Sequence, residues 1–252
     1  NQRSWLHFSG TIAGDYGFDV RHNLTGDANG ADWANGSLSM GDGWDLTMGT
    51  FKLATSREAI IGDGHQMALD RSAGYAVGQG ISLGHSTDDM GVTLQVVNNG
   101  AGDGALNDSA YTYLMRVEYL ASGSWGQFDQ FTSGSGGAAG TLVGFSYWAH
   151  DAGNGNTANE DQTTWNVDVQ WQWGGSALYL SYLDFSDDNN AAADTNITQL
   201  MYSYDMGDNW EVYARWTDNE LNSGSTTDIG VNNYLAGQNA KWTTQMTMDD
   251  TG

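Results

Sequence analysis

The chain has 252 residues, with 8 Lys and Arg against 31 Asp and Glu, and it contains no Cys and no Pro. Without Cys there is no disulfide framework, thiolate metal site or cysteine nucleophile. The net charge of −23 is opposite in sign to the surface that binds nucleic acid, so no such partner is expected. Aromatic residues make up 12%, which is too rich for an acidic disordered chain.

Apolar and polar residues alternate with a period of two along most of the chain, which predicts β-strands with two different faces. Between Thr164 and Trp173, for example, every second residue is Trp or Val and the residues between them are Asn, Asp or Gln. A short helical turn is expected only around residues 125–131. We predict fourteen strands, over residues 5–13, 18–26, 31–40, 45–54, 79–88, 91–99, 111–121, 141–152, 163–173, 177–187, 197–207, 210–221, 229–236 and 240–249.

The connections between these strands are sorted by length. Odd-to-even turns are short, whereas most even-to-odd loops are long: 55–78, 100–110, 153–162, 188–196 and 222–228. The connection 122–140 departs from this rule, because it is long on the short-turn side. Such sorting predicts one all-β domain over residues 1–252, a transmembrane antiparallel up-and-down β-barrel. A soluble secreted β-sandwich that binds carbohydrate through exposed Trp is an alternative, since its strands also alternate.

Some segments carry a more specific pattern. Gly49-Thr50-Phe51-Lys52 leads into Ser56-Arg57-Glu58, and Asp70-Arg71-Ser72 and Gly80-Ile81-Ser82 follow. Arg116–Tyr119 with Gly126–Phe131, and residues 231–235 with 239–242, complete the set. From about residue 5 to 249, the chain resembles the phosphate-selective porin O and P family.

The resemblance implies a trimeric, sixteen-stranded diffusion channel in a bacterial outer membrane, in contact with the bilayer and its outer-leaflet lipid. Its solutes would be small hydrophilic molecules or ions, including anions such as phosphate. The chain ends on the loop-like stretch 249–252, so we expect two further strands beyond it. A structural outer-membrane barrel that holds a partner assembly is an alternative function.

Charged residues on the polar strand faces are the candidates for lining the pore. One interpretation is that their cations polarise the lumen or attract anions, and the other is that they form ordinary ion pairs within the wall. For Lys52 the alternation leaves the direction open, because it points outward unless the strand shifts near Gly49. The candidates are Arg21, Arg116, Arg215, Lys241, Asp19, Glu118, Asp168 and Glu211.

Loop 55–78 is the longest on its side, and in the resembling family the loop at this place can fold into the pore. Arg57, Glu58, Asp70 and Arg71 are therefore candidates for a constriction. Alternatively, Arg57 and Arg71 pin the loop to the wall through charge-assisted hydrogen bonds, which we favour for at least one of them.

No enzymatic activity and no metal or other cofactor is expected. Gly80–Gly84 matches G-x-S-x-G, but it lies inside a predicted strand and not at a strand–turn–helix elbow. The five His residues are scattered. Residues 187–190 and 160–161 offer oxygen ligands for Ca²⁺ but lack EF-hand spacing, so we interpret them as solvated acidic loops.

Overall fold

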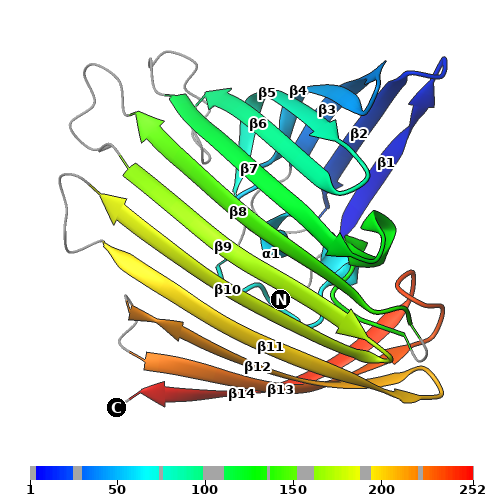
Figure 1. The fold of residues 1–252 in the computed structure, drawn as a ribbon, viewed down its shortest axis with the longest axis vertical. Coiled ribbons are helices and arrows are strands. Elements are labelled where there is room, and N and C mark those ends of the chain that lie inside the picture. Colours follow the sequence, from blue (N-terminus) through cyan, green and yellow to red (C-terminus); the bar gives the residue numbers. More distant parts are fainter. Residues whose placement is uncertain are drawn as a thin grey trace.

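The structure is a computed structural model that describes residues 4–24, 30–73, 76–98, 111–134, 137–151, 162–187, 194–220 and 224–251. Within these residues the chain forms a single sheet of fourteen antiparallel strands, each paired with its neighbours in sequence. The sheet curls into a barrel wall that stays open between β1 and β14 (Figure 1). The strands are β1 (Trp5–Ile12), β2 (Tyr16–Asn23), β3 (Gly30–Gly41), β4 (Trp44–Lys52), β5 (Val77–Ser86), β6 (Met90–Asn98), β7 (Tyr111–Ser122), β8 (Gly140–Asp151), β9 (Gln162–Trp173), β10 (Ser176–Asp187), β11 (Thr195–Gly207), β12 (Trp210–Asn219), β13 (Gly224–Tyr234) and β14 (Lys241–Thr251).

This architecture confirms the predicted all-β, up-and-down fold and its fourteen strands. The single sheet also shows that the β-sandwich alternative is wrong, because no second sheet packs against it among the described residues. The largest error in strand position concerns β13, which begins at Gly224 and not near residue 229. Residues 224–228 have no apolar alternation, yet they pair with β12 on one side and with β14 on the other.

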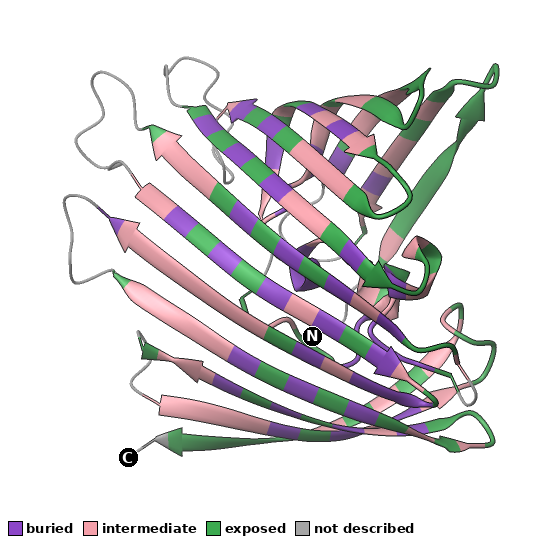
Figure 2. Cartoon of the chain, in the orientation of Figure 1, coloured by how far each residue is buried: buried purple, intermediate pink, exposed green. Residues whose placement is uncertain are grey.

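The two faces of the wall have opposite polarity. On β9, the inward Asn166, Asp168 and Gln170 are buried, whereas the outward Trp165 and Trp171 are exposed. Figure 2 shows this alternation as bands along the central strands, such as β7, β8 and β9. A water-soluble domain buries its apolar residues, so a wall with exposed apolar side chains requires an apolar surrounding on its outside. Among the described residues, no helix is long and apolar enough to cross a membrane.

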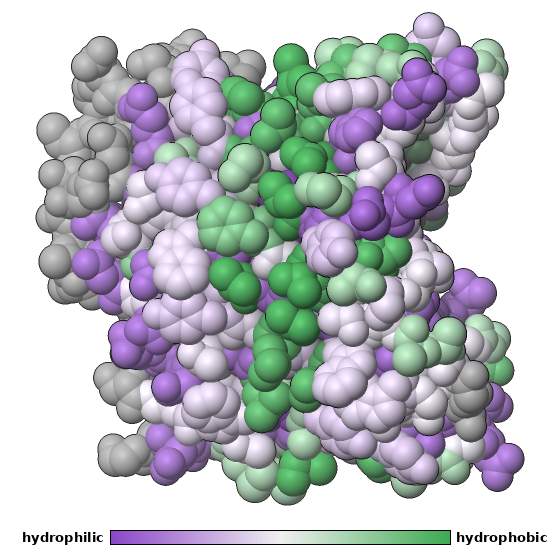
Figure 3. All heavy atoms as spheres, in the orientation of Figure 1, coloured by the Kyte–Doolittle hydropathy of each residue, from purple (hydrophilic) through white to green (hydrophobic). Residues whose placement is uncertain are grey.

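Aromatic side chains border the apolar band on its two sides. Figure 3 shows the band crossing the strands, with pale aromatic side chains beside it. Near the long-loop ends, the rings of Trp165 and Tyr182 lie 5.1 Å apart. Near the turn ends, the rings of Trp171 and Trp173 lie 4.6 Å apart, and Tyr202 follows 6.3 Å from Trp173. Trp165 and Trp171 are separated by roughly 20 Å at ~3.3 Å per residue, which approaches the ~25 Å apolar band of outer-membrane barrels.

The strand β4 has an irregular backbone at Gly49 but keeps its facing, because Thr47 before it and Phe51 after it both border the same cavity inside the barrel. The φ angle of Gly49 is +122°, a conformation that L side chains rarely adopt. Lys52, the last residue of the strand, also borders this cavity, and its ammonium group donates to the carbonyl oxygen of Ile61 at 3.5 Å. The direction of Lys52, which alternation left open, is therefore inward.

Replacing Gly49 by Ala is expected to destabilise the barrel by about 1–3 kcal/mol, because the backbone is held where only Gly is unstrained. A Cβ at this position would also lie 2.4 Å from the carbonyl oxygen of Ala34. The measurement is urea unfolding of the refolded protein in detergent micelles, followed by Trp fluorescence. Gly126→Ala is the matched control, since no heavy atom lies within 4 Å of its added Cβ. Equal stability of the two variants would contradict the prediction.

Two connections bring short helices to the lumen. Residues 53–73, here called the inward loop, contain α1 (Arg57–Ile60) and the 3-10 helix η1 (Asp63–His65), and they leave the long-loop end of β4. Residues 123–134, here called the turn-side segment, contain the 3-10 helix η2 (Trp125–Asp129) between β7 and β8. The helical turn near residue 125 was predicted, whereas α1 was not, because a helix of four residues carries no apolar periodicity.

Candidate functional site

The first residues of the inward loop pack against the wall through apolar side chains and then cap a short helix. Leu53 and Ala54 are buried against Val97 and Leu114 of the wall. The Ser56 side chain then accepts a hydrogen bond from the backbone N–H of Ala59 at 3.1 Å, which caps α1. These contacts turn the chain away from β4 and into the barrel.

The first turn of α1 joins a buried network of charges. Arg116 donates to both carboxylate oxygens of Asp168, at 3.0 and 2.8 Å, and to Glu118 at 3.0 Å. Arg57 donates to Glu118 at 3.2 Å from its guanidinium and to Asp168 at 2.9 Å from its backbone N–H. The structure thus brings four of the predicted site residues together and ties the inward loop to β7 and β9.

Glu58 lies at the centre of a second group of contacts. Its carboxylate accepts hydrogen bonds from the side chain and backbone of Ser72, and its Oε1 lies 3.7 Å from a guanidinium nitrogen of Arg215. Arg215 also donates to Asp228 at 2.7 Å and to the backbone carbonyl of Asp70. Glu58 and Asp70, both predicted for a constriction, therefore lie against β12, with Asp70 bonding Arg215 through its backbone.

Arg71 bonds within the inward loop. It donates to the carbonyl oxygens of Glu58 at 2.9 Å and Ile61 at 2.8 Å, and it forms an ion pair with Asp63. Arg57, by contrast, reaches the wall through Glu118. Of the two arginines expected to pin the loop, Arg57 bonds to the wall, and the contacts of Arg71 described above shape the loop itself.

The inward loop contacts every strand from β9 to β14. The groups that bond it are the Asp168 carboxylate, the Tyr179 hydroxyl, the Gln199 amide, the Arg215 guanidinium, the Asn232 amide and the Lys241 ammonium. This half of the lumen is consequently occupied by protein, and five of these six side chains are buried, whereas that of Lys241 is partly exposed.

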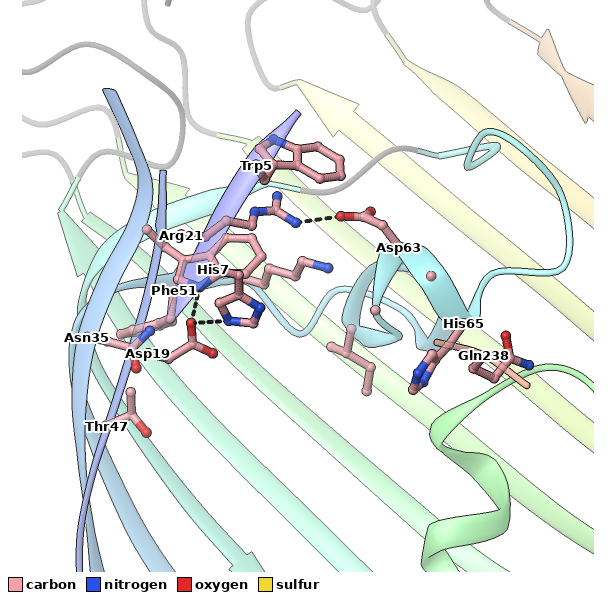
Figure 4. Close-up of a pocket in the computed structure, with 15 residues that line it drawn as sticks. Trp5, His7, Asp19, Arg21, Asn35, Thr47, Phe51, Asp63, His65 and Gln238 are labelled. Carbon is pink, nitrogen blue, oxygen red and sulfur yellow. Dashed lines mark hydrogen bonds and ion pairs between the residues drawn. The ribbon is translucent and has the colours of Figure 1, made fainter. Parts of the chain in front are cut away.

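On the opposite side, a cavity of about 710 Å³ separates the inward loop from β1–β4. Figure 4 shows Asp19, Asn35 and Thr47 on the wall and Asp63 and His65 on the loop. The complete lining is Trp5, His7, Asp19, Arg21, Trp33, Asn35, Thr47, Phe51, Lys52, Ile60, Gly62, Asp63, Gly64, His65 and Gln238. We take this cavity as the candidate site for solute passage.

Arg21 crosses from the wall to the inward loop at this cavity. Its guanidinium lies 3.6 Å from the ring centroid of Trp33 and 4.3 Å from that of Trp5. It donates to Asp32 at 2.9 Å and to Asp63 at 2.5 Å. Two aromatic faces and two carboxylates therefore hold one cation, which fixes its orientation.

The other predicted pore-lining residues lie at different places on the inner face. Asp19 borders the large cavity and accepts hydrogen bonds from Trp33 at 2.6 Å and from the ring of His7 at 2.8 Å. Glu211 borders a second cavity, of about 410 Å³, and accepts from Tyr234 at 2.5 Å. Arg116, Asp168 and Arg215 are buried beneath the inward loop, Glu118 lies beside Arg116, and Lys241 donates to the carbonyl oxygen of Gln66. Their role in permeation stays a prediction.

Sequence reasoning missed several residues that border the large cavity. Trp5, His7 and Trp33 share the inward parity of Arg21, and this alternation was the signal that could have found them. Asp63 and His65 lie in the inward loop, where no periodicity indicates direction. Of the acidic stretches considered for Ca²⁺, residues 160–161 and 188–190 lie outside the described residues, and Asp187 accepts a hydrogen bond from Gln162 at 3.1 Å.

Comparisons with known proteins identify the fold. No protein-family model and no curated protein matches the chain. A porin whose structure was refined at 1.8 Å aligns with a TM-score of 0.64 at 14% identity, over 99% of this chain and 87% of that one. OmpT of Vibrio cholerae with loop L8 deleted aligns with a TM-score of 0.60 at 12% identity, over 98% and 84%. OccK10 (OpdN) of Pseudomonas aeruginosa gives 0.53 at 12%, over 98% and 87%. The chain therefore has the fold of the outer-membrane porins.

Proposed function

We propose that this protein is a porin of the bacterial outer membrane, a passive diffusion channel for small hydrophilic solutes or ions that performs no chemistry. The observation that carries the proposal is the polarity of the wall, which is apolar and aromatic outside and polar inside. Such a wall contacts lipid on one face and encloses a polar lumen on the other. The porin fold of the structural neighbours supports the same assignment.

Selection in this channel would combine size and charge. The inward loop narrows the lumen to the side of β1–β4, where the large cavity is bordered by Arg21 and Lys52 and by Asp19 and Asp63. Charged groups of both signs that lie close together beside a low-dielectric wall create a strong local electric field in the lumen. A small polar solute that exchanges water for these groups would pass, whereas a large or apolar solute would not.

A preference for anions such as phosphate is the finer proposal that the resemblance to the phosphate-selective porin O and P family suggests. The approach of Arg21 and Arg71 to Asp63 supports it, because two guanidinium groups share that carboxylate. The trimeric state is likewise a proposal that rests on the resemblance.

The test is reconstitution of the purified, refolded protein into planar lipid bilayers. Stepwise, ohmic openings are expected, and their reversal potential in a KCl gradient would measure the anion preference. Bilayers that stay silent while the protein inserts would overturn the channel. That outcome would favour the alternative of a structural barrel, for which the filling of the lumen on the side of β9–β14 is the supporting observation.

A further inference from the structure

The turn-side segment reaches the inward loop from the opposite end of the barrel. The carbonyl oxygen of Phe128 accepts a hydrogen bond from the Arg57 guanidinium, and that of Asp129 accepts one from His65 Nδ1 at 3.0 Å. The backbone N–H of Phe131 donates to the carbonyl oxygen of His65 at 3.4 Å. The two connections, which leave opposite ends of the sheet, therefore bond to each other inside the wall.

The same segment is also bonded to the wall. The side-chain amides of Gln170 and Gln172 on β9 both donate to the carbonyl oxygen of Gln130, at 2.6 and 3.0 Å. On the far side, Gln238 from the β13–β14 turn donates to the hydroxyl of Thr132 at 2.9 Å. Hydrogen bonds thus connect the turn-side segment to β9 on one side and to the β13–β14 turn on the other.

An apolar cluster fills the space between these contacts. Phe131 is 0% exposed, and its ring lies 4.8 Å from that of Tyr179 in an edge-on arrangement. The cluster joins residues of the inward loop, such as Met67, to residues of the wall, such as Met201 and Tyr213. A cluster packed this closely leaves no room for water, so a hydrated ion cannot pass through it.

We propose that the turn-side segment is a plug that seals the half of the lumen beside β9–β13. Solutes then pass only through the cavity along β1–β4. This inference rests on the proposed channel function and goes beyond it by assigning a role to residues 123–134 and a route to the solute. It also explains why this connection is long although it leaves the short-turn end of the barrel.

Cysteine accessibility tests the route directly, because the chain contains no Cys of its own. Thr47→Cys and Asn35→Cys place a thiol on the large cavity, and Ser203→Cys places one in the sealed half, where Ser203 is 0% exposed. A small charged methanethiosulfonate reagent is applied to open channels in planar bilayers. We expect a stepwise loss of current for the two cavity variants and none for Ser203→Cys. Modification of Ser203→Cys at the same rate as Thr47→Cys would overturn the plug.

A second experiment opens the proposed plug by shortening one of its buried side chains. Phe131→Ala is expected to raise the unitary conductance and to make Ser203→Cys reactive in the double variant. Phe145→Ala is the matched control, since Phe145 is 39% exposed on the outer face of β8. Folding of each variant is checked by heat-dependent mobility in SDS gels. If Phe131→Ala does not fold, the cysteine comparison in the unaltered background still decides the question.

The two proposals fail in different ways. A wild-type protein that inserts into bilayers and never conducts overturns the channel. A wild-type protein that conducts while Ser203→Cys loses current on modification overturns only the plug. Unchanged conductance of a folded Phe131→Ala variant, with Ser203→Cys still unreactive in it, would likewise overturn the plug.

Discussion

Replacing Arg116 by Met is expected to destabilise the folded barrel by about 3–5 kcal/mol, because the removed guanidinium leaves buried carboxylates uncompensated. Arg116 is 1% exposed and donates to Asp168, which is 2% exposed, and to Glu118. The Arg116 guanidinium packs directly against the backbone of β8, since a Cβ on Gly144 would lie 2.3 Å from it. The free energy of unfolding is measured by urea titration in detergent micelles.

Two further variants test whether the loss of stability arises because the ion pair is buried. The double variant Arg116→Met/Asp168→Leu removes both charges and is expected to recover part of the loss, because no unpaired Asp168 carboxylate remains. His7→Gln removes one partner of the pair with Asp19, whose side chains are 48% and 38% exposed, and is expected to cost no more than about 1 kcal/mol. Equal losses for Arg116→Met and His7→Gln would show that the buried network does not hold the inward loop.

Replacing Asp63 by Asn is expected to shift the reversal potential toward anion preference by a severalfold change in permeability ratio. The substitution keeps the side-chain volume and removes the carboxylate that Arg21 and Arg71 share beside the large cavity. The measurement is the reversal potential of reconstituted channels in a KCl gradient. This prediction presupposes the proposed channel.

The matched control is Asp88→Asn, which makes the same change of charge at an exposed turn between β5 and β6. It is expected to leave the reversal potential close to that of the wild type, because exposed charges away from the narrow region are screened by salt. A shift of equal size in both variants would mean that the acidic rim, and not the Arg21–Asp63 contact, sets the selectivity.

The Asp63 contact also predicts how the inward loop responds to acid. Burial alone would raise the pKa of Asp63, but the neighbouring Arg71, Lys52 and Arg21 hold it below its ordinary value. A carboxylate with a lowered pKa in the folded state contributes stability above its unfolded pKa and loses it as the pH falls through the folded value. The stability difference between wild type and Asp63→Asn should therefore persist at mildly acidic pH and disappear only below the usual range of aspartate. Urea titrations over a pH series check this, and an unchanged difference at the lowest pH would contradict it.

The sequence by itself determined the wall of this protein. Alternation over Thr164–Trp173 is a local property with a period of two, so it assigns each residue to one face without knowledge of its neighbours in space. Loop lengths sorted by parity then indicate the up-and-down order. Both predictions are confirmed by the fourteen-stranded sheet.

Only the tertiary structure decided what fills the wall. Arg57 bonds Asp168, 111 residues away, and Met67 accepts from Asn232, 165 residues away. Such contacts depend on the curvature of the whole sheet, and no local period encodes them. For the same reason alternation placed Arg21, Arg116 and Arg215 on one inner face alike. All three are buried, but only Arg21 borders the large cavity once the loop has docked. The direction of a side chain in a strand is set by the alternation of the pleated backbone. The direction of a side chain in an inserted connection is set by the residues against which that connection packs.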